Sequence, residues 1–330
     1  MREFTLIRAR STGQALQALA AHPQARLMAG GTTLYDLMKL GVERPQAVID
    51  INGIDELRTF DTSGQRELVF GALARMSDVA ADQRLVADYP ALSESLWRAA
   101  SQQLRNMASL GGNVLQRTRC AYFRGGEPFA CNKRVPGSGC AAIGGIDRGH
   151  ALLGGSPHCI ATYPGDFAVA LVAFDAVLDV IGPNGPRTLP VEALHRLPGD
   201  RPDLETTLAP GEIIVRIRVP ATTLGRASVY HKIRDRESYA FALSSAAVAV
   251  TLVGGKVEQA RIALGGVATK PWRARVAEQG LVGQALTLET ALAAGFAAFM
   301  DARAGEHNAF RVELGARTVA DALMIASSRT

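Results

Sequence analysis

The segment Arg26–Gly41, RLMAGGTTLYDLMKLG, changes from an extended to a helical pattern within sixteen residues. Glycines let a backbone approach a phosphate closely, and the free N–H groups at the start of a helix favour an anion. The pattern is neither G-x-G-x-x-G nor a Walker loop, so a phosphate site and an ordinary turn both remain open. We expect a strand over Arg26–Ala29, a turn at Gly30 and Gly31, an N-cap at Thr32 or Thr33, and a helix over Leu34–Leu40 closed by Gly41.

Two later segments have related features. SLGGNV, Ser109–Val114, again places a small polar residue after a pair of glycines, and it follows an amphipathic segment. TYPGDFAVALVAFDAVLDVIG, Thr162–Gly182, turns through Tyr-Pro-Gly into Asp166 and a long apolar run. The position of Asp166 predicts a helix N-cap, although its carboxylate could equally accept hydrogen bonds from a ribose or a ring amide.

Length and composition place the chain among soluble globular proteins. Its 330 residues exceed a single core, so we expect two or three domains, and 48% hydrophobic with 20% charged residues excludes a disordered chain. The net charge of +5 is spread without a basic block, which argues against a nucleic-acid-binding protein. The start MREFTLIRARSTGQAL lacks an apolar signal core, and no apolar run reaches membrane-span length, so we expect neither an export signal nor a membrane span.

All four cysteines lie in one 40-residue window, with 10, 8 and 18 residues between successive members. This confinement favours metal ligation over the disulfides of a small secreted protein. An iron–sulfur cluster takes four thiolates at variable spacing, whereas structural zinc usually shows a C-x(2–4)-C pair that is missing here. Cluster, zinc and unrelated thiols all remain open from spacing alone. The candidate ligands are Cys120, Cys131, Cys140 and Cys159.

The residues between the cysteines agree with ligation. CNKRVPGSGC, Cys131–Cys140, contains almost nothing that could build a core, so we expect a metal group to fold it. A cluster held by four thiolates is anionic, and nearby cations would stabilise it. The cations of this window are Arg117, Arg119, Arg124, Lys133 and Arg134.

Together these segments resemble a known family. AGGTTLYDL is similar to the pyrophosphate loop, and SLGGNV to the second glycine loop, of the flavin subunits of molybdenum hydroxylases, the xanthine dehydrogenase and aldehyde oxidoreductase family. EIIVRIRVP, SVYHKIRDRESYAFALSSAAVAV and IALGGVATKPWRA resemble later parts of the same subunits, so the resemblance covers essentially the whole chain. The cysteine window is similar to the insertion of bacterial three-subunit, periplasmic aldehyde oxidoreductases, whose flavin subunit carries an additional [4Fe-4S] cluster.

The resemblance implies an α+β fold. We expect a two-part α/β FAD-binding domain of the vanillyl-alcohol-oxidase/PCMH type, followed by a small C-terminal antiparallel sheet with a helical bundle. The expected bounds are residues 1–60, residues 61–222 with the iron–sulfur insertion at about 117–160, and residues 226–330. FAD would lie between the first two parts.

The resemblance also implies site residues. The first loop would wrap the pyrophosphate, the second would approach the pyrophosphate and the flavin edge, and three later residues match positions that contact the flavin or its adenosine. If these residues do not contact a flavin, we expect Lys232 to be an exposed surface residue and Ile214 to belong to the core. His158 and His231 receive no role. The expected FAD-binding residues are Leu27, Met28, Ala29, Gly30, Gly31, Thr32, Thr33, Leu34, Tyr35, Ser109, Gly112, Asn113, Asp166, Ile214 and Lys232.

The implied function is electron transfer within a complex. A molybdenum-cofactor large subunit would oxidise an aldehyde, a small subunit with two-iron clusters would pass electrons on, and this chain would deliver them through FAD to an external acceptor. A heterotrimer, or a dimer of it, is expected, either exported with a signal-bearing partner or cytoplasmic. The alternatives are a xanthine, purine or other heterocycle dehydrogenase, a stand-alone oxidase, and a non-redox scaffold whose four cysteines hold a structural zinc ion.

Overall fold

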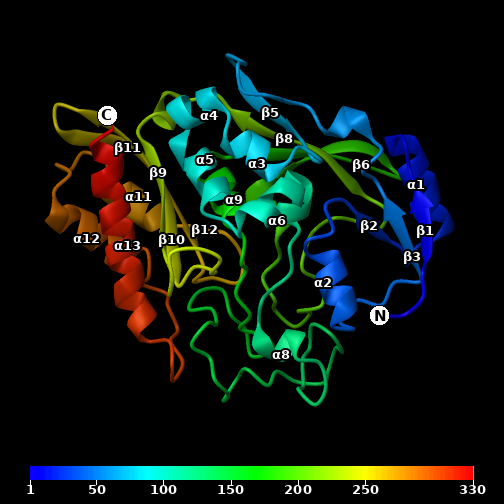
Figure 1. Ribbon diagram of the computed structural model, residues 1–330. Helices are drawn as coiled ribbons and strands as arrows, with labels where there is room; N and C mark the ends of the chain where they lie inside the picture. The colour runs from blue at the N-terminus through cyan, green and yellow to red at the C-terminus, as the bar shows by residue number, and fades with distance from the viewer. Residues whose placement is uncertain (330) are drawn as a thin grey trace.

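The structure is a computed structural model, and it describes residues 1–329. The chain forms three sheets with their helices. The first sheet lies at the right of Figure 1, and the C-terminal sheet and its helices lie at the left. The first sheet has three parallel strands in the order β1-β3-β2. Its elements are β1 (Thr5–Arg8), α1 (Thr12–Ala21), β2 (Arg26–Met28), α2 (Leu34–Lys39) and β3 (Ala47–Asp50).

The second sheet has five antiparallel strands in the order β4-β5-β8-β6-β7. These strands are β4 (Phe60–Asp61), β5 (Glu67–Gly71), β6 (Val177–Gly182), β7 (Gly185–Pro190) and β8 (Ile213–Pro220). The short helices of this part are η1 (Asp55–Leu57), α3 (Met76–Ala80), α4 (Gln83–Asp88), α5 (Pro90–Trp97), α6 (Gln102–Met107), α7 (Leu110–Val114), α9 (Phe167–Ala173) and α10 (Val191–Leu194).

Helix α9 is the centre of the largest core. All seven of its residues, FAVALVA, are buried, because it contacts α5 and α7 as well as strands of the C-terminal sheet. A helix that is apolar all round is stable only when it is covered on every side. The run that the sequence shows after Asp166 is therefore an internal helix followed by β6.

The C-terminal part is an antiparallel sheet in the order β12-β11-β10-β9, covered by helices. Gly254 and Gly255 both have positive φ and form the two-residue turn between β10 and β11, as a tight hairpin requires. The elements are η2 (Thr223–Gly225), β9 (Ser228–Ile233), β10 (Ser244–Val253), β11 (Lys256–Gly265), β12 (Trp272–Arg273), α11 (Arg275–Leu281), α12 (Leu288–Ala297) and α13 (Phe310–Ser327).

The cysteine segment between α7 and α9 is almost free of regular structure. Its only helix is α8 (Ala121–Arg124), and the segment forms the lower edge of the molecule in Figure 1. Side chains hold it instead: Arg134 donates to the carbonyls of Tyr122 and Phe123, each at 2.8 Å, and Asn132 Nδ2 donates to the carbonyl of His158 at 3.0 Å. From the sequence we expected a metal group to fold this stretch, whereas the structure shows that polar side chains also order it.

The predicted fold class is confirmed, whereas two local details differ. Strand β2 ends at Met28 and helix α2 at Lys39, each one residue earlier than expected, and Gly41 follows with φ of 70°. Thr33 occupies the N-cap position, but its side chain makes no capping hydrogen bond, because its φ and ψ of −114° and −52° are already helical. Among the described residues, no helix combines the length and apolar character needed to cross a bilayer.

Candidate functional site

The first glycine loop lies against the segment that leads into the second. A Cβ placed on Gly30 would stand 1.8 Å from the carbonyl oxygen of Met107, so no side chain fits there. Met107 ends α6, two residues before Ser109. This contact brings together the two loops that the sequence predicts to approach a pyrophosphate.

The turn itself is open on its other side. Gly31 has φ of 72°, and the nearest atom to a Cβ there would be Cβ of Tyr35 at 3.9 Å. Within residues 1–329, the hydroxyls of Thr32 and Thr33 have no hydrogen-bond partner in the protein. Positive φ, open space and two available hydroxyls fit the binding of a phosphate group. Leu27 and Met28 lie in β2, and Leu34 and Tyr35 open α2.

The second loop offers a buried polar atom that lacks a partner. Ser109 caps α7 by accepting a hydrogen bond from the Gly112 N–H at 3.2 Å, and its side chain is buried. Asn113 Nδ2 lies 3.4 Å from the sulfur of Met76, while its Oδ1 is buried without a hydrogen bond. A buried acceptor of this kind costs free energy unless it is satisfied. Asn113 therefore fits a site in which a bound donor, such as a ring amide of a flavin, completes the hydrogen bonding.

Asp166 and Lys232 form a buried ion pair. Lys232 Nζ lies 2.9 Å from Asp166 Oδ2, and Tyr230 OH donates to Asp166 Oδ1 at 2.6 Å. Only 1% of the lysine side chain and 6% of the aspartate side chain are exposed. Asp166 does stand at the N-cap position of α9, but its carboxylate makes no capping bond, because it is committed to these two partners. The interpretation of Lys232 as an ordinary exposed lysine is wrong.

The remaining predicted flavin contact is a core residue. Ile214 is buried in the large core around α9, which is the role that an ordinary isoleucine has. It lies on β8 of the five-stranded sheet, whereas the first glycine loop follows β2 of the three-stranded sheet. The structure thus brings together the two glycine loops and, separately, Asp166 with Lys232, and it leaves a contact of Ile214 with a flavin as a prediction.

The four cysteines are free thiols that converge within the cysteine segment. Cys131 and Cys140 face each other in an antiparallel bridge, and Cys120 and Cys159 approach from either end of the segment. The charges of Cys131 and Cys159 both affect the Cys120 thiol. Burial raises the pKa of Cys120 to about 11 and also raises that of Cys159, so ligation would have to displace protons from these thiols.

The spacing of these thiols bears on the kind of metal group. In residues 1–329, no three His, Cys, Asp or Glu side chains are grouped closely enough to bind one metal ion. A zinc ion would draw four sulfur atoms to about 2.3 Å from one centre. An iron–sulfur cluster is larger and takes a thiolate at each corner, so four converging but separated thiols fit it better.

The cysteine segment packs directly on the helix that follows the first glycine loop. Leu37 of α2, Phe123 of α8 and Cys131 form one small buried cluster, with Cys120 at its margin. Arg124 of α8 also pairs with Asp36 of α2 at 2.7 Å. Helix α2, which follows the candidate flavin loop, therefore packs directly against two of the four cysteines.

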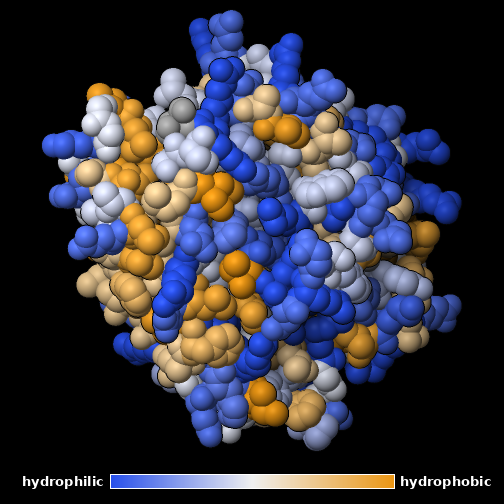
Figure 2. Space-filling view, turned by 60° about the vertical axis from the view of Figure 1, so that its left-hand side comes forward, coloured by the Kyte–Doolittle hydropathy of each residue, from blue (hydrophilic) through white to orange (hydrophobic). Residues whose placement is uncertain are grey.

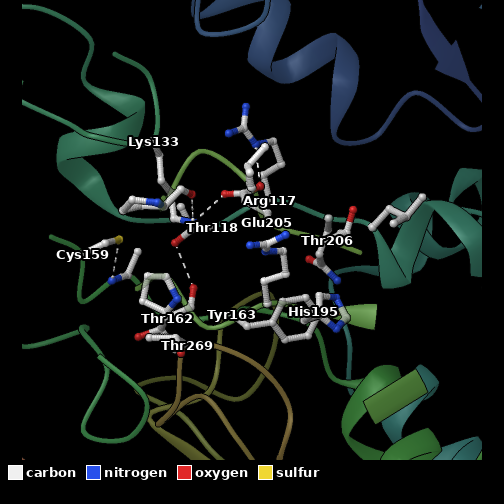
Figure 3. Close-up of a pocket in the computed structure, with 17 residues that line it drawn as sticks. Arg117, Thr118, Lys133, Cys159, Thr162, Tyr163, His195, Glu205, Thr206 and Thr269 are labelled. Atoms are coloured by element: carbon white, nitrogen blue, oxygen red, sulfur yellow. Dashed lines mark hydrogen bonds and ion pairs between the residues drawn. The ribbon is translucent and has the colours of Figure 1, made fainter. Parts of the chain in front are cut away.

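Most of the cations expected to balance a cluster have carboxylate partners. Arg117 pairs with Glu43 at 2.5 Å and with Glu205 at 2.8 Å, and Lys133 pairs with Glu205 at 2.9 Å. Figure 3 shows Arg117, Glu205 and Lys133 of this network beside Cys159, where all four line one pocket. These cations hold the pKa of Glu205 below its usual value despite burial, and the network is closer to neutral than the sequence indicated.

Three functional candidates escaped sequence reasoning. His150 Nε2 lies 3.2 Å from Cys120 Sγ, Tyr230 binds Asp166, and Glu205 binds two cations of the cysteine segment. Each contact joins residues at least 30 positions apart in the chain. The sequence offered only weak signals: a histidine inside the cysteine window and a tyrosine two positions before the matched lysine.

Comparison with known proteins agrees with this geometry. Residues 2–222 match the profile of the FAD binding domain in molybdopterin dehydrogenase, and residues 228–326 match that of the CO dehydrogenase flavoprotein C-terminal domain. The chain is 44% identical over 327 residues to the aldehyde oxidoreductase FAD-binding subunit PaoB of Escherichia coli (strain K12), covering 98% of each chain. It is 30% identical to the carbon monoxide dehydrogenase medium chain of Hydrogenophaga pseudoflava, covering 88% of this chain and 83% of that one.

A solved structure shows the same architecture. Carbon monoxide dehydrogenase from Hydrogenophaga pseudoflava, in a form that lacks the Mo-pyranopterin moiety, superposes with a TM-score of 0.77 and 28% identity over 99% of this chain and 98% of that one. The two profiles together span nearly all of the sequence, and each carries residues of the candidate site. The chain therefore belongs to the FAD-binding subunits of the molybdenum hydroxylase family and is an oxidoreductase subunit.

Proposed function

We propose that this chain is the electron-transfer subunit of a molybdenum-dependent aldehyde oxidoreductase and carries both FAD and a [4Fe-4S] cluster. The observation that carries the proposal is the small buried cluster of Leu37, Phe123 and Cys131, which joins the flavin loop to the four-thiol segment. The 44% identity to an aldehyde oxidoreductase subunit supports the choice of aldehydes over purines as the substrates of the complex.

The residues of the two glycine loops would hold the FAD. Thr32 and Thr33 would donate hydroxyl hydrogen bonds to the pyrophosphate, and Gly31 would keep the backbone open to it. Asn113 Oδ1 would accept from the bound cofactor. The bound FAD supplies the ability to accept electrons and release them to an acceptor, and the protein fixes its position and surroundings.

A buried, hydrogen-bonded group of side chains would lie near the flavin. It consists of Asp166, Lys232 and Tyr230. Lys232 Nζ also donates to the carbonyl of Arg98 at 3.2 Å, so the ammonium group is held by two oxygen atoms. A buried pair of this kind is rigid and resists rearrangement when the charge beside it changes. We infer that these residues set the electrostatic environment of the cofactor and do not themselves transfer protons.

The four cysteines would hold the cluster, one thiolate to each iron. Its place beside α2 suggests that it exchanges electrons with the flavin or stabilises the loop that binds it. Arg119 and Arg134 have no carboxylate within ion-pair distance among residues 1–329, so they remain available to balance the charge of a thiolate-bound cluster.

Large and small partner subunits, which contain the molybdenum cofactor and two-iron clusters, would complete the enzyme. Figure 2 shows hydrophobic residues exposed in several groups among hydrophilic ones. On the cysteine segment, Val135 is 60% and Ile146 is 70% exposed. The compartment stays a prediction, as do the domain bounds at residues 1–60, 61–222 and 226–330.

Analysis of the native protein tests this proposal. The chain should copurify with two other polypeptides, contain FAD and iron, and show bleaching of its flavin absorption when the complex receives an aldehyde. A purine that bleaches the flavin while aldehydes do not would move the assignment to a purine dehydrogenase. A colourless protein that contains zinc would refute it and support a structural zinc site made by the four cysteines.

A further inference from the structure

His150 stands beside one of the four thiols, in a position that the proposed function does not use. Its Nε2 lies 3.2 Å from Cys120 Sγ. The histidine is 5% exposed, and Cys120 is only partly accessible. Among the described residues, no other cysteine sulfur of the segment has a side-chain hydrogen-bond partner, although Cys159 Sγ accepts from the backbone N–H of Ala161 at 3.4 Å.

We propose that His150 donates an N–H···S hydrogen bond to the Cys120 thiolate and thereby raises the reduction potential of the cluster. This inference rests on the proposed function, because it takes Cys120 as a cluster ligand. His150 would be a positioning and tuning residue, not a ligand. The three remaining thiolates would lack an equivalent side-chain donor, so the effect would fall on one corner of the cluster.

The surroundings of the ring determine which nitrogen carries the proton. Nδ1 is buried and has no hydrogen-bond partner. A thiolate can only accept, so a bond to it requires the proton on Nε2, which leaves Nδ1 with an unused lone pair.

The C-terminal part of the chain helps to hold the backbone at His150 in place. The backbone N–H of His150 donates to the carbonyl of Asp147 at 2.8 Å, and its own carbonyl accepts from Arg311 Nη1 at 2.6 Å. Arg311 lies on α13 and is 1% exposed. Asn308 adds a second bond to the same carbonyl at 3.4 Å. The backbone that carries the donor is thus fixed both within the cysteine segment and by residues of the C-terminal part.

The direction of the effect follows from electrostatics. Reduction adds negative charge to the cluster and its thiolates, so a donor aimed at a sulfur stabilises the reduced form more than the oxidised form. Removal of the donor should make reduction harder. If the hydrogen bond favours the reduced form over the oxidised form by a factor of ten, it raises the midpoint potential of a one-electron couple by about 59 mV.

The test compares non-donor, donor and control variants of the native complex. His150→Leu and His150→Met remove the donor, His150→Gln retains an N–H group, and His158→Leu changes an exposed histidine of the same segment. Iron content is measured for each, together with the cluster's midpoint potential by redox titration followed by electron paramagnetic resonance. The wild-type protein is analysed first. If it contains no cluster, the proposed function itself is refuted, and this result is separate from the comparison of the variants.

We expect every variant to retain iron. At the wild-type midpoint, the non-donor variants should show about a tenfold lower ratio of reduced to oxidised cluster, which is a midpoint about 59 mV lower. His150→Gln should recover at least half of that shift, and His158→Leu should match the wild type. Unchanged midpoints in the non-donor variants would overturn the inference. Loss of iron from both of them would also overturn it, because His150 would then be a ligand or a structural requirement.

Discussion

Substitution of Gly30 tests whether the two glycine loops form one cofactor cradle. In Gly30→Ala, the new Cβ would lie 1.8 Å from the carbonyl oxygen and 2.6 Å from the carbonyl carbon of Met107. Real Cβ atoms essentially never come closer than 3.0 Å, so the loops must separate by at least 1.2 Å at this point. The obstructing atoms are backbone, which cannot rotate away as a side chain could.

The expected cost has two parts. Overpacking of this kind destabilises a protein by about 1–3 kcal/mol. Separation of the loops by more than about 1 Å also moves Thr32 and Thr33 relative to Asn113, and a lost 1.4 kcal/mol of binding energy is a tenfold loss of affinity at about 25 °C. We therefore expect FAD affinity to fall about tenfold or more, with a lower melting temperature.

The measurement is the ratio of bound FAD to protein after gel filtration, with thermal unfolding recorded on the same samples. Gly280→Ala is the matched control, because a Cβ at Gly280 in α11 meets nothing within 4 Å and its φ is not in the left-handed region. Full FAD content and an unchanged melting temperature in Gly30→Ala would show that the loops do not form a shared cradle.

Three further predictions concern packing, charge and pH. Leu37→Ala should cost about 2–5 kcal/mol and lower FAD and iron content together, measured by unfolding and cofactor analysis; loss of one cofactor alone would contradict a shared unit. Lys232→Met should cost about 3–5 kcal/mol by stranding the buried Asp166, and adding Asp166→Asn should recover part of it in a double-mutant cycle; additive losses would refute this coupling. Burial lowers the pKa of His195 from 6.5 to about 4, so the stability it contributes is complete above pH 6.5 and declines by up to about 3 kcal/mol as the pH falls toward 4. His195→Gln should flatten that decline in acid unfolding curves, and an unchanged slope would exclude His195 as its source.

Local sequence patterns were sufficient for the elements of the first glycine loop, whereas the fold class followed from the resemblance to a known family. The segment Arg26–Gly41 indicated a strand, a turn and a helix because their signals lie next to one another in the chain. The glycine that closes the helix, Gly41, is similarly local. Such features depend on backbone conformations that glycine adopts readily, so residue type alone predicts them.

Contacts between distant segments could not be predicted in the same way. Nothing near Lys232 in the sequence indicates burial, because its partner Asp166 lies 66 positions away. Nothing near Gly30 in the sequence indicates its close approach to the Met107 backbone. The carboxylates that pair with Arg117 and Lys133 also come from outside the cysteine window, which is why the sequence overstated its positive charge.

The iron content of the native complex with and without Cys131 tests most directly whether the four thiols hold a cluster. If the four thiols hold a cluster packed against the flavin loop, Cys131→Ser should lower the iron content by the equivalent of one four-iron cluster per copy of this chain. Iron in the partner subunits should be unaffected, as shown by unchanged two-iron signals in electron paramagnetic resonance. Wild-type iron content and an unchanged cluster spectrum in Cys131→Ser would contradict the account.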